Sequence, residues 1–188
     1  MEETPSLIFI TGGVRSGKSS FAEKTAIQLA KKSGAHLHYI ATGVPSDREM
    51  RKRIQNHQQQ RQESIIQWQT WEEPREISKY SQHFSEKSII LLDCLTTLLN
   101  NHLFSTESES IPDTVEKAII NEIDSLKDIC QTLVIVSNEV LNESVQDNAL
   151  VYTYKKLLGK LHQQLVQQTD QAYLVESGIP ILMKGAKE

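Results

Sequence analysis

The sequence predicts a three-layer α/β domain in which a mostly parallel central sheet is flanked by helices. Short apolar runs that do not alternate with polar residues, such as residues 89–92, are typical of parallel strands covered on both faces. These runs alternate along the chain with longer amphipathic stretches, and a glycine-rich loop joins the first strand to the first helix. The 188 residues show one composition throughout, so we expect a single domain, 1–188.

The glycine-rich loop has the spacing of a phosphate-binding P-loop, since Gly12 is followed by four residues and then by Gly17, Lys18 and Ser19. Glycines let backbone N–H groups turn around a phosphate, the lysine reaches the β- and γ-phosphates, and the hydroxyl ligates Mg²⁺. The fold class is therefore that of a P-loop NTPase (RecA-like), with Lys18 as a catalytic residue and Ser19 as a metal ligand. The predicted triphosphate site consists of Gly12, Gly13, Val14, Arg15, Ser16, Gly17, Lys18 and Ser19.

The predicted strands are runs of apolar residues bounded by polar or glycine-containing turns. We expect them at residues 7–10, 37–41, 65–71, 89–92, 133–136 and 171–176. The run at 89–92 is wholly apolar, which places it in the centre of the sheet. The segment 65–71 is more polar and is predicted only to be extended.

The predicted helices follow from caps and from apolar residues at helical spacing. We expect them from residue 20, at 47–60, from residue 72, and at 95–104, 114–130 and 149–168. Asp47 caps a polar helix that has Met50 and Ile54 on its apolar side. Pro74 suits the first turn of the helix that begins at residue 72.

Polar residues stand where several predicted strands end, within residues 41–43, at Asp93 and Cys94, and at residues 137–139. In open parallel sheets the chemistry lies at the carboxyl ends of the strands, so these residues are expected to share one site. Asp93 follows four apolar residues, as a Walker B aspartate does, and is predicted to hold Mg²⁺ directly or through water. The alternative is that Asp93 only caps the following helix.

The predicted helix at 47–60 carries a second signal. Arg53, His57 and Arg61 recur at four-residue spacing and share one helix face. Two neighbouring guanidinium groups favour a neutral imidazole, which is a nucleophile, and they can bind phosphates that are attacked or released. Transfer of a phosphoryl or nucleotidyl group through His57 is one interpretation. A solvated histidine on a basic, glutamine-rich helix is the other, and spacing alone does not choose between them.

Composition narrows the class of protein further. A net charge of −4 argues against broad electrostatic attachment to nucleic acid or to an anionic membrane. We expect no signal peptide, no membrane span and a cytoplasmic location. The two cysteines have no metal-ligand spacing and are expected to be reduced. Four other histidines also lack ligand spacing and are expected at the surface or in loops: His36, His38, His83 and His102.

Taken together, these motifs resemble the bifunctional adenosylcobinamide kinase / adenosylcobinamide-phosphate guanylyltransferase family of cobalamin biosynthesis. The resemblance spans nearly the whole chain, and the arginine and serine inside the P-loop are distinctive. It rests on the segments Thr11–Ser19, Tyr39–Thr42, Leu92–Thr97 with Asn100, Val136–Val140 and Gly178–Pro180. It rests also on single positions between them, which are Asp47, Glu49, Met50, Arg53, Ile54, His57 and Arg61, and then Trp68, Thr70, Glu72 and Pro74.

The resemblance implies two reactions. The γ-phosphate of ATP or GTP is transferred to the hydroxyl of the aminopropanol arm of adenosylcobinamide. GTP then guanylylates a histidine, matched here by His57, and the GMP passes to adenosylcobinamide phosphate. The family also implies Mg²⁺, a corrinoid substrate and a homotrimer, and it places further residues around the guanine nucleotide. The matching positions are Thr42, Gly43, Gln58, Gln59, Gln60, Arg61, Glu72 and Asp93.

One region departs from the family pattern. After Val140 the family continues with a glycine-rich turn, Gly-x-Gly-Ile-Val-Pro, whereas residues 141–146 contain neither glycine nor proline. Residues 154–156 replace an Arg-Asp pair, and His162-Gln163 stands in place of Asn-Gln. Loss of the glycines and of the arginine alters the predicted acceptor side more than the nucleotide side. A divergent paralogue with only one of the two activities, or a non-catalytic GTP-binding regulatory module, therefore remains an alternative.

Overall fold

The computed structural model of the chain describes residues 6–43, 52, 55, 59, 66–104, 112–140 and 149–186. Its centre is a seven-stranded sheet with the strand order β3-β2-β4-β5-β1-β6-β7. The strands are β1 (Leu7–Gly12), β2 (His36–Ala41), β3 (Trp68–Glu72), β4 (Ser88–Asp93), β5 (Thr132–Asn138), β6 (Gln171–Glu176) and β7 (Ile179–Lys184). Among the described strands, β7 alone runs antiparallel to its neighbour.

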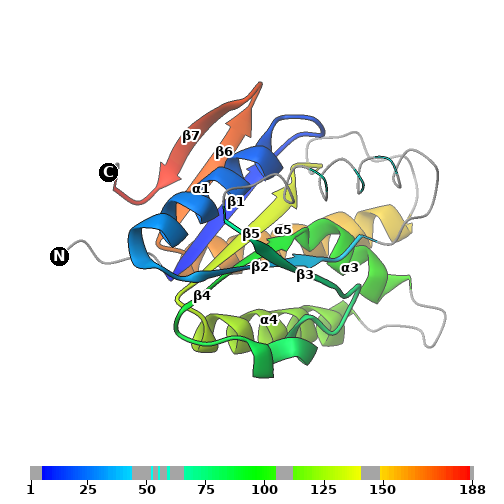
Figure 1. Ribbon diagram of the computed structural model, residues 1–188. Helices are drawn as coiled ribbons and strands as arrows, with labels where there is room; N and C mark the ends of the chain where they lie inside the picture. Colours follow the sequence, from blue (N-terminus) through cyan, green and yellow to red (C-terminus); the bar gives the residue numbers. More distant parts are fainter. Residues whose placement is uncertain are drawn as a thin grey trace.

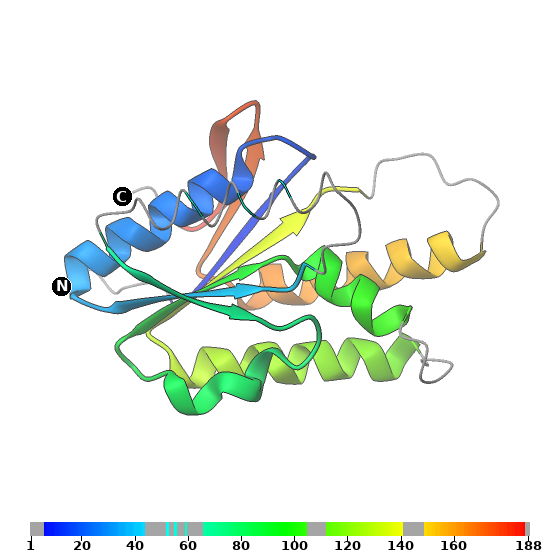
Figure 2. The ribbon, with the colours of Figure 1, turned by 45° about the vertical axis from the view of Figure 1, so that its right-hand side comes forward.

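Helices cover both faces of the sheet (Figures 1 and 2). Helix α1 (Lys18–Ser33) packs on one face against the central strands. Helices α3 (Leu95–Leu103), α4 (Pro112–Ile129) and α5 (Ala149–Gln168) lie together on the other face. A 3₁₀ helix, η1 (Ile77–His83), follows β3 and packs on α4. The three-layer α/β prediction is confirmed. Within the described ranges, no helix combines the length and apolarity that crossing a bilayer requires.

The alternation of side chains along β1 shows how two cores form. Leu7 and Phe9 point into the cluster shared with α3, α4 and α5, whereas Ile8 and Ile10 pack on the face covered by α1. All four side chains are almost completely buried. A strand covered on both sides needs apolar residues at every position, which is the run that the sequence shows.

Most predicted elements are present, but two differ. The helix expected from residue 72 begins only at Ile77, because Glu72 still pairs with Ala41 in the sheet. Glu73 then accepts hydrogen bonds from the backbone N–H groups of Arg75 and Glu76, and this local turn competes with a helix. Strand β7 was not predicted. The two-residue turn before it, Ser177 and Gly178, has positive φ at both positions and reverses the chain.

The predicted helix at 47–60 lies largely outside the described residues. Lys52, Gln55 and Gln59, which are described, are helical. The prediction that His38 lies at the surface or in a loop is wrong, because His38 is a buried residue of β2 with 3% exposure.

Candidate nucleotide-binding site

The P-loop joins β1 directly to α1, as the motif requires. Its turn is held by a hydrogen bond from the Ser16 N–H to the Gly13 carbonyl, and α1 starts with the Phe21 N–H bonded to the Gly17 carbonyl. Gly17 stands before the helix with φ of 90°, and Arg15 also has a positive φ of 61°. The loop therefore turns tightly and exposes the first N–H groups of a helix, which attract phosphate.

Two P-loop glycines are required by close packing. A Cβ atom on Gly12 would lie 2.4 Å from the Val175 carbonyl oxygen in β6. A Cβ atom on Gly17 would lie 3.2 Å from Gly178 Cα, and the φ of Gly17 is itself unfavourable for other residues. Gly13 differs, because its added Cβ would meet nothing within 4 Å.

The P-loop lysine is held inside the loop. Lys18 is 6% exposed, and its Nζ donates a hydrogen bond of 3.0 Å to the Gly13 carbonyl. Ser19 follows at the first turn of α1 and is partly exposed. The Ser16 hydroxyl is buried with no hydrogen-bond partner among the described residues, while Val14 and Arg15 are exposed on the loop. The cradle thus keeps an ammonium group and backbone donors together, as a triphosphate site needs.

Asp93 ends β4, two strands from the P-loop strand in the order β4-β5-β1. Tyr39 of β2 donates a hydrogen bond of 2.9 Å from its hydroxyl to Asp93 Oδ2. The alternative, in which Asp93 caps α3, is wrong because the N-cap of that helix is Cys94 and no side chain caps it. Asp93 is therefore a partly exposed carboxylate at the carboxyl edge of the sheet, oriented by a tyrosine.

Thr42 connects the ends of β2 and β4. Its hydroxyl donates to the Cys94 carbonyl at 2.9 Å and accepts from the Cys94 N–H at 2.8 Å. The Thr42 carbonyl in turn accepts a hydrogen bond of 2.9 Å from Asn101 of α3. Thr42 is fully buried, and the next residue, Gly43, is partly exposed. The role of Thr42 visible in the structure is to fix the backbone next to Asp93.

A second polar group lies between α3, β5 and α5, where the sequence analysis expected Asn138 and Cys94 at the site but gave no role to Thr96, Thr97 or Tyr154. Asn138 donates to the Thr96 hydroxyl at 2.9 Å, and Tyr154 donates to the Thr96 carbonyl at 3.1 Å. Cys94 Sγ lies 3.0 Å from the Thr96 hydroxyl and 3.1 Å from that of Thr97. Burial, with a smaller effect from the charge of Asp93, raises the pKa of Cys94 and keeps it a thiol. Polar residues directly after β4 and at the end of β5 were the available signal.

Other predicted site residues divide into two groups. Glu72 ends β3 beside Ala41 of β2 and is exposed at the same carboxyl edge. Gln59 is helical and exposed. His57, Gln58, Gln60 and Arg61 lie outside the described residues, so their roles remain predictions.

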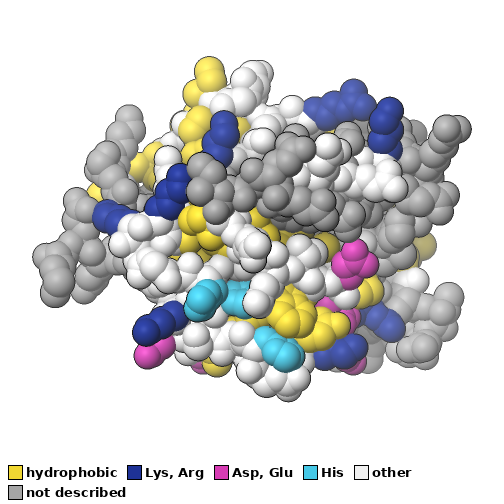
Figure 3. Space-filling view, viewed as in Figure 1, with side chains coloured by type: hydrophobic (Ala, Val, Ile, Leu, Met, Phe, Trp, Pro, Cys, Tyr) yellow, Lys and Arg dark blue, Asp and Glu magenta, His cyan; other side chains and the backbone are white. Residues whose placement is uncertain are grey.

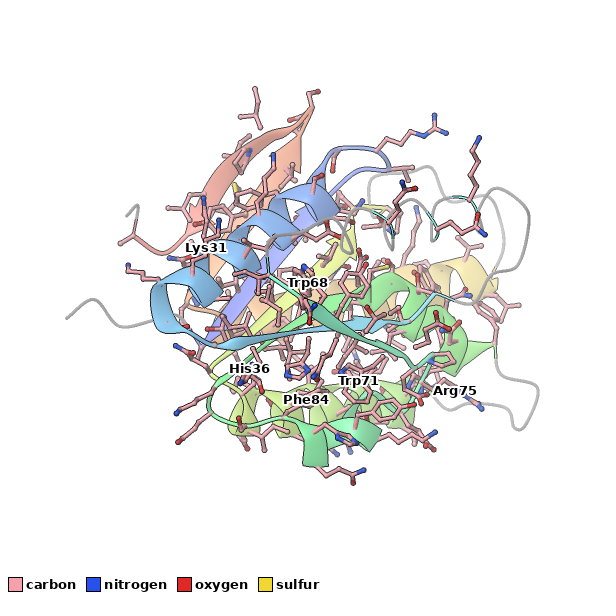
Figure 4. All side chains as sticks on the ribbon, viewed as in Figure 1. Lys31, His36, Trp68, Trp71, Arg75 and Phe84 are labelled. Carbon is pink, nitrogen blue, oxygen red and sulfur yellow. The ribbon has the colours of Figure 1, made fainter. Side chains whose placement is uncertain are left out.

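Histidines and aromatic side chains gather beside β3, on the face shown in Figure 3. Trp71 donates from Nε1 to His38 Nδ1 at 3.3 Å and stacks on His83 with ring centroids 4.8 Å apart. Phe84 packs edge-on against both His38 and Trp71, and Figure 4 shows Trp68 and Trp71 on opposite sides of β3. Burial lowers the pKa of His38 to about 4, helped by the nearby His36 and His83. His38 is therefore a neutral packing residue.

His162 of α5 is also buried. Its Nε2 lies 2.8 Å from the Ser137 hydroxyl, and its ring packs edge-on against Phe9. Burial lowers the pKa of His162, while the charge of Glu139 opposes the shift. His162 thus supplies a contact between α5 and the end of β5.

These features define a RecA-like P-loop nucleotide-binding protein. A solved structure with the same fold is the flagellar accessory protein FlaH from Methanocaldococcus jannaschii. It matches with a TM-score of 0.50 and 13% identity, over 97% of this chain and 81% of that one.

Within this class, the chain belongs to the cobinamide kinase / cobinamide phosphate guanyltransferase family, whose sequence pattern matches residues 8–183. The bifunctional adenosylcobalamin biosynthesis protein CobU of Escherichia coli is 34% identical over 188 residues, covering 95% of this chain and 99% of that protein. CobP of Pseudomonas aeruginosa, with the same description, is 32% identical over 177 residues, covering 94% of this chain and 96% of that protein.

Proposed function

We propose that this chain carries out both reactions of its family. It phosphorylates adenosylcobinamide with ATP or GTP, and it transfers GMP from GTP to adenosylcobinamide phosphate. The main observation behind the proposal is that the P-loop, with its buried Lys18, and the Asp93 carboxylate both lie at the carboxyl ends of the parallel strands. The family match, which covers residues 8–183, supports it. A cytoplasmic location and a homotrimer belong to this proposal and rest on the family alone.

In the kinase reaction the oxygen of the acceptor hydroxyl attacks the γ-phosphorus, and the hydroxyl proton passes to solvent. The bond from that phosphorus to the β–γ bridging oxygen breaks, and ADP or GDP leaves. The P-loop N–H groups and Lys18 bind the phosphates on which charge accumulates. The oxygen donors Ser19 and Asp93 fit Mg²⁺, which prefers hydroxyl, carboxylate and phosphate oxygens. When bound, Mg²⁺ neutralises charge on the β- and γ-phosphate oxygens.

In the guanylyltransferase reaction a ring nitrogen of His57 attacks the α-phosphorus of GTP, and pyrophosphate leaves. An oxygen of adenosylcobinamide phosphate then attacks the same phosphorus, the phosphorus–nitrogen bond breaks, and His57 is regenerated. A neutral imidazole is needed for the first step, and the predicted neighbours Arg53 and Arg61 favour that form.

The mass of the intact protein after incubation with Mg²⁺ and GTP tests the second reaction. A single GMP adduct is expected at neutral or alkaline pH, where a phosphoramidate bond persists, and it should be absent in His57→Asn. GTP binding without an adduct in the wild-type protein would contradict transfer through His57.

The departure at residues 141–146 favours a second candidate function, in which only one activity survives. Separate turnover assays with adenosylcobinamide and with its phosphate distinguish the two. Product from both acceptors supports the bifunctional enzyme, whereas product from one supports a single-activity paralogue. Bound GTP with no turnover and no adduct would support a regulatory module.

A further inference from the structure

The tip of the β6–β7 hairpin touches the P-loop. Ser177 and Gly178 form its two-residue turn, with φ of 51° and 81°, between the paired residues Glu176 and Ile179. The Gly178 N–H donates a hydrogen bond of 2.8 Å to the Ser16 carbonyl. In both ribbon views the hairpin tip lies beside the loop between β1 and α1 (Figures 1 and 2).

This hydrogen bond fixes the direction of a donor group in the P-loop. In a trans peptide the C=O of one residue and the N–H of the next point in opposite directions. Because the Ser16 carbonyl points to the hairpin, the Gly17 N–H points away from it, and the proposed function puts the phosphates on that side of the loop. The close approach of Gly12 to the Val175 carbonyl adds a second contact between this hairpin and the loop.

We propose that Gly178 is a positioning residue for triphosphate binding, and that the β6–β7 turn holds the Gly17 N–H in the direction that a phosphate oxygen needs. The inference rests on the proposed nucleotide chemistry. It assigns to the turn a role that the P-loop motif itself does not include, since Gly178 lies more than 150 residues from the P-loop in sequence.

The test is the substitution Gly178→Ala, matched by Gly34→Ala. Both glycines have a left-handed φ, 81° and 73°, and an added Cβ would meet nothing within 4 Å at either position. Each substitution therefore strains the backbone in the same way without a steric clash. Gly34 caps the far end of α1, a 16-residue helix about 24 Å long, so it lies away from the P-loop. The Tm of both variants should be lower than that of the wild-type protein by a similar amount, about 2–4 °C.

Binding of GTP and of guanosine is measured by calorimetry for the wild-type protein and both variants. Gly178→Ala is expected to weaken GTP binding about fivefold and to leave guanosine binding unchanged, because guanosine has no phosphate. Gly34→Ala should change neither affinity. Unchanged GTP binding by Gly178→Ala, equal losses for GTP and guanosine, or an equal loss in Gly34→Ala would each overturn the inference.

A second variant is expected to strengthen GTP binding instead of weakening it. Asn-Gly is the preferred pair for a two-residue hairpin turn with positive φ at both positions, so Ser177→Asn should stabilise the turn. If Gly178→Ala does not fold, tighter GTP binding by Ser177→Asn supports the inference, and unchanged or weaker binding overturns it. Wild-type protein that binds no GTP would overturn the proposed function and the inference with it. Wild-type binding with an unaffected Gly178→Ala would overturn the inference alone.

Discussion

The hydroxyl of Tyr39 donates a hydrogen bond of 2.9 Å to Oδ2 of Asp93. Tyr39 is almost buried in β2 and pairs with Leu91, so its side chain reaches along β4 to the carboxylate at the end of that strand. A rigid, buried phenol thereby holds one of the two carboxylate oxygens. We infer that Tyr39 orients Asp93 for its proposed role with Mg²⁺.

Tyr39→Phe tests this relationship, because it removes the hydroxyl and keeps the ring. The Mg²⁺ concentration that gives half-maximal turnover should rise about two- to tenfold, since a freely rotating Asp93 must be ordered when the ion binds. GTP affinity without Mg²⁺ should stay unchanged, and the loss of one hydrogen bond should lower Tm by about 2–4 °C. An unaltered Mg²⁺ dependence would show that Tyr39 has only a structural role.

Thr42→Val should destabilise the end of β2 strongly. Valine has the shape of threonine but leaves the buried N–H of Cys94 without its acceptor and removes one of the two donors to the Cys94 carbonyl, which keeps its hydrogen bond from the Leu98 N–H. We expect a loss of about 2–4 kcal/mol and a Tm lower by about 5–12 °C in thermal unfolding. Thr42→Ser keeps the hydroxyl and is the matched control, with an expected loss of about 1 kcal/mol from the missing methyl group. Equal losses in the two variants would contradict the role given to the hydroxyl.

The fold could be predicted because its signals are local. A strand covered on both faces must be apolar at each position, so β1, β4 and β5 were visible as apolar runs. The P-loop could be predicted because glycine spacing and a strand before it are both recorded in the sequence. Strand β7 was not predicted because it is an exposed edge strand with a proline near its start. Its turn also uses Ser-Gly instead of the more usual Asn-Gly.

The contacts of the candidate site were harder to predict because they join residues far apart in sequence. Tyr39 and Asp93 are 54 residues apart, and Gly178 reaches the P-loop from the last hairpin. His38 was assigned to the surface because a histidine in an apolar strand gives no local sign of its partners. Its burial depends on Trp71 and Ser88, which the sheet brings to it.

Gly12→Ala and Gly13→Ala should differ although the residues are adjacent. The new Cβ at position 12 would lie 2.4 Å from the backbone carbonyl of Val175, which cannot move without displacing β6. The same atom at position 13 meets nothing. We expect Gly12→Ala to lose about 2–4 kcal/mol of unfolding free energy and Gly13→Ala less than about 1 kcal/mol, both measured by urea denaturation. Similar stability of the two variants would show that β6 does not constrain the loop.

His38 should make the folded state less stable in mild acid. Its pKa is lowered to about 4 in the folded chain, against 6.5 for an unperturbed histidine. Between these values the unfolded chain binds a proton that the folded chain does not, so the free energy of unfolding falls as the pH falls from 6.5 to 4. The resulting loss of unfolding free energy from His38 is about 3 kcal/mol, and it is recovered as the pH rises.

His38→Gln keeps a hydrogen-bond acceptor for Trp71 and removes the titration. Urea denaturation at several pH values should therefore show a shallower slope for this variant between pH 6.5 and 4, by up to about 1.4 kcal/mol per pH unit. The slope should not vanish, because burial also lowers the pKa of His162, which contributes in the same direction. Identical slopes in the wild-type protein and in His38→Gln would mean that His38 accepts its proton in the folded state as readily as in the unfolded chain.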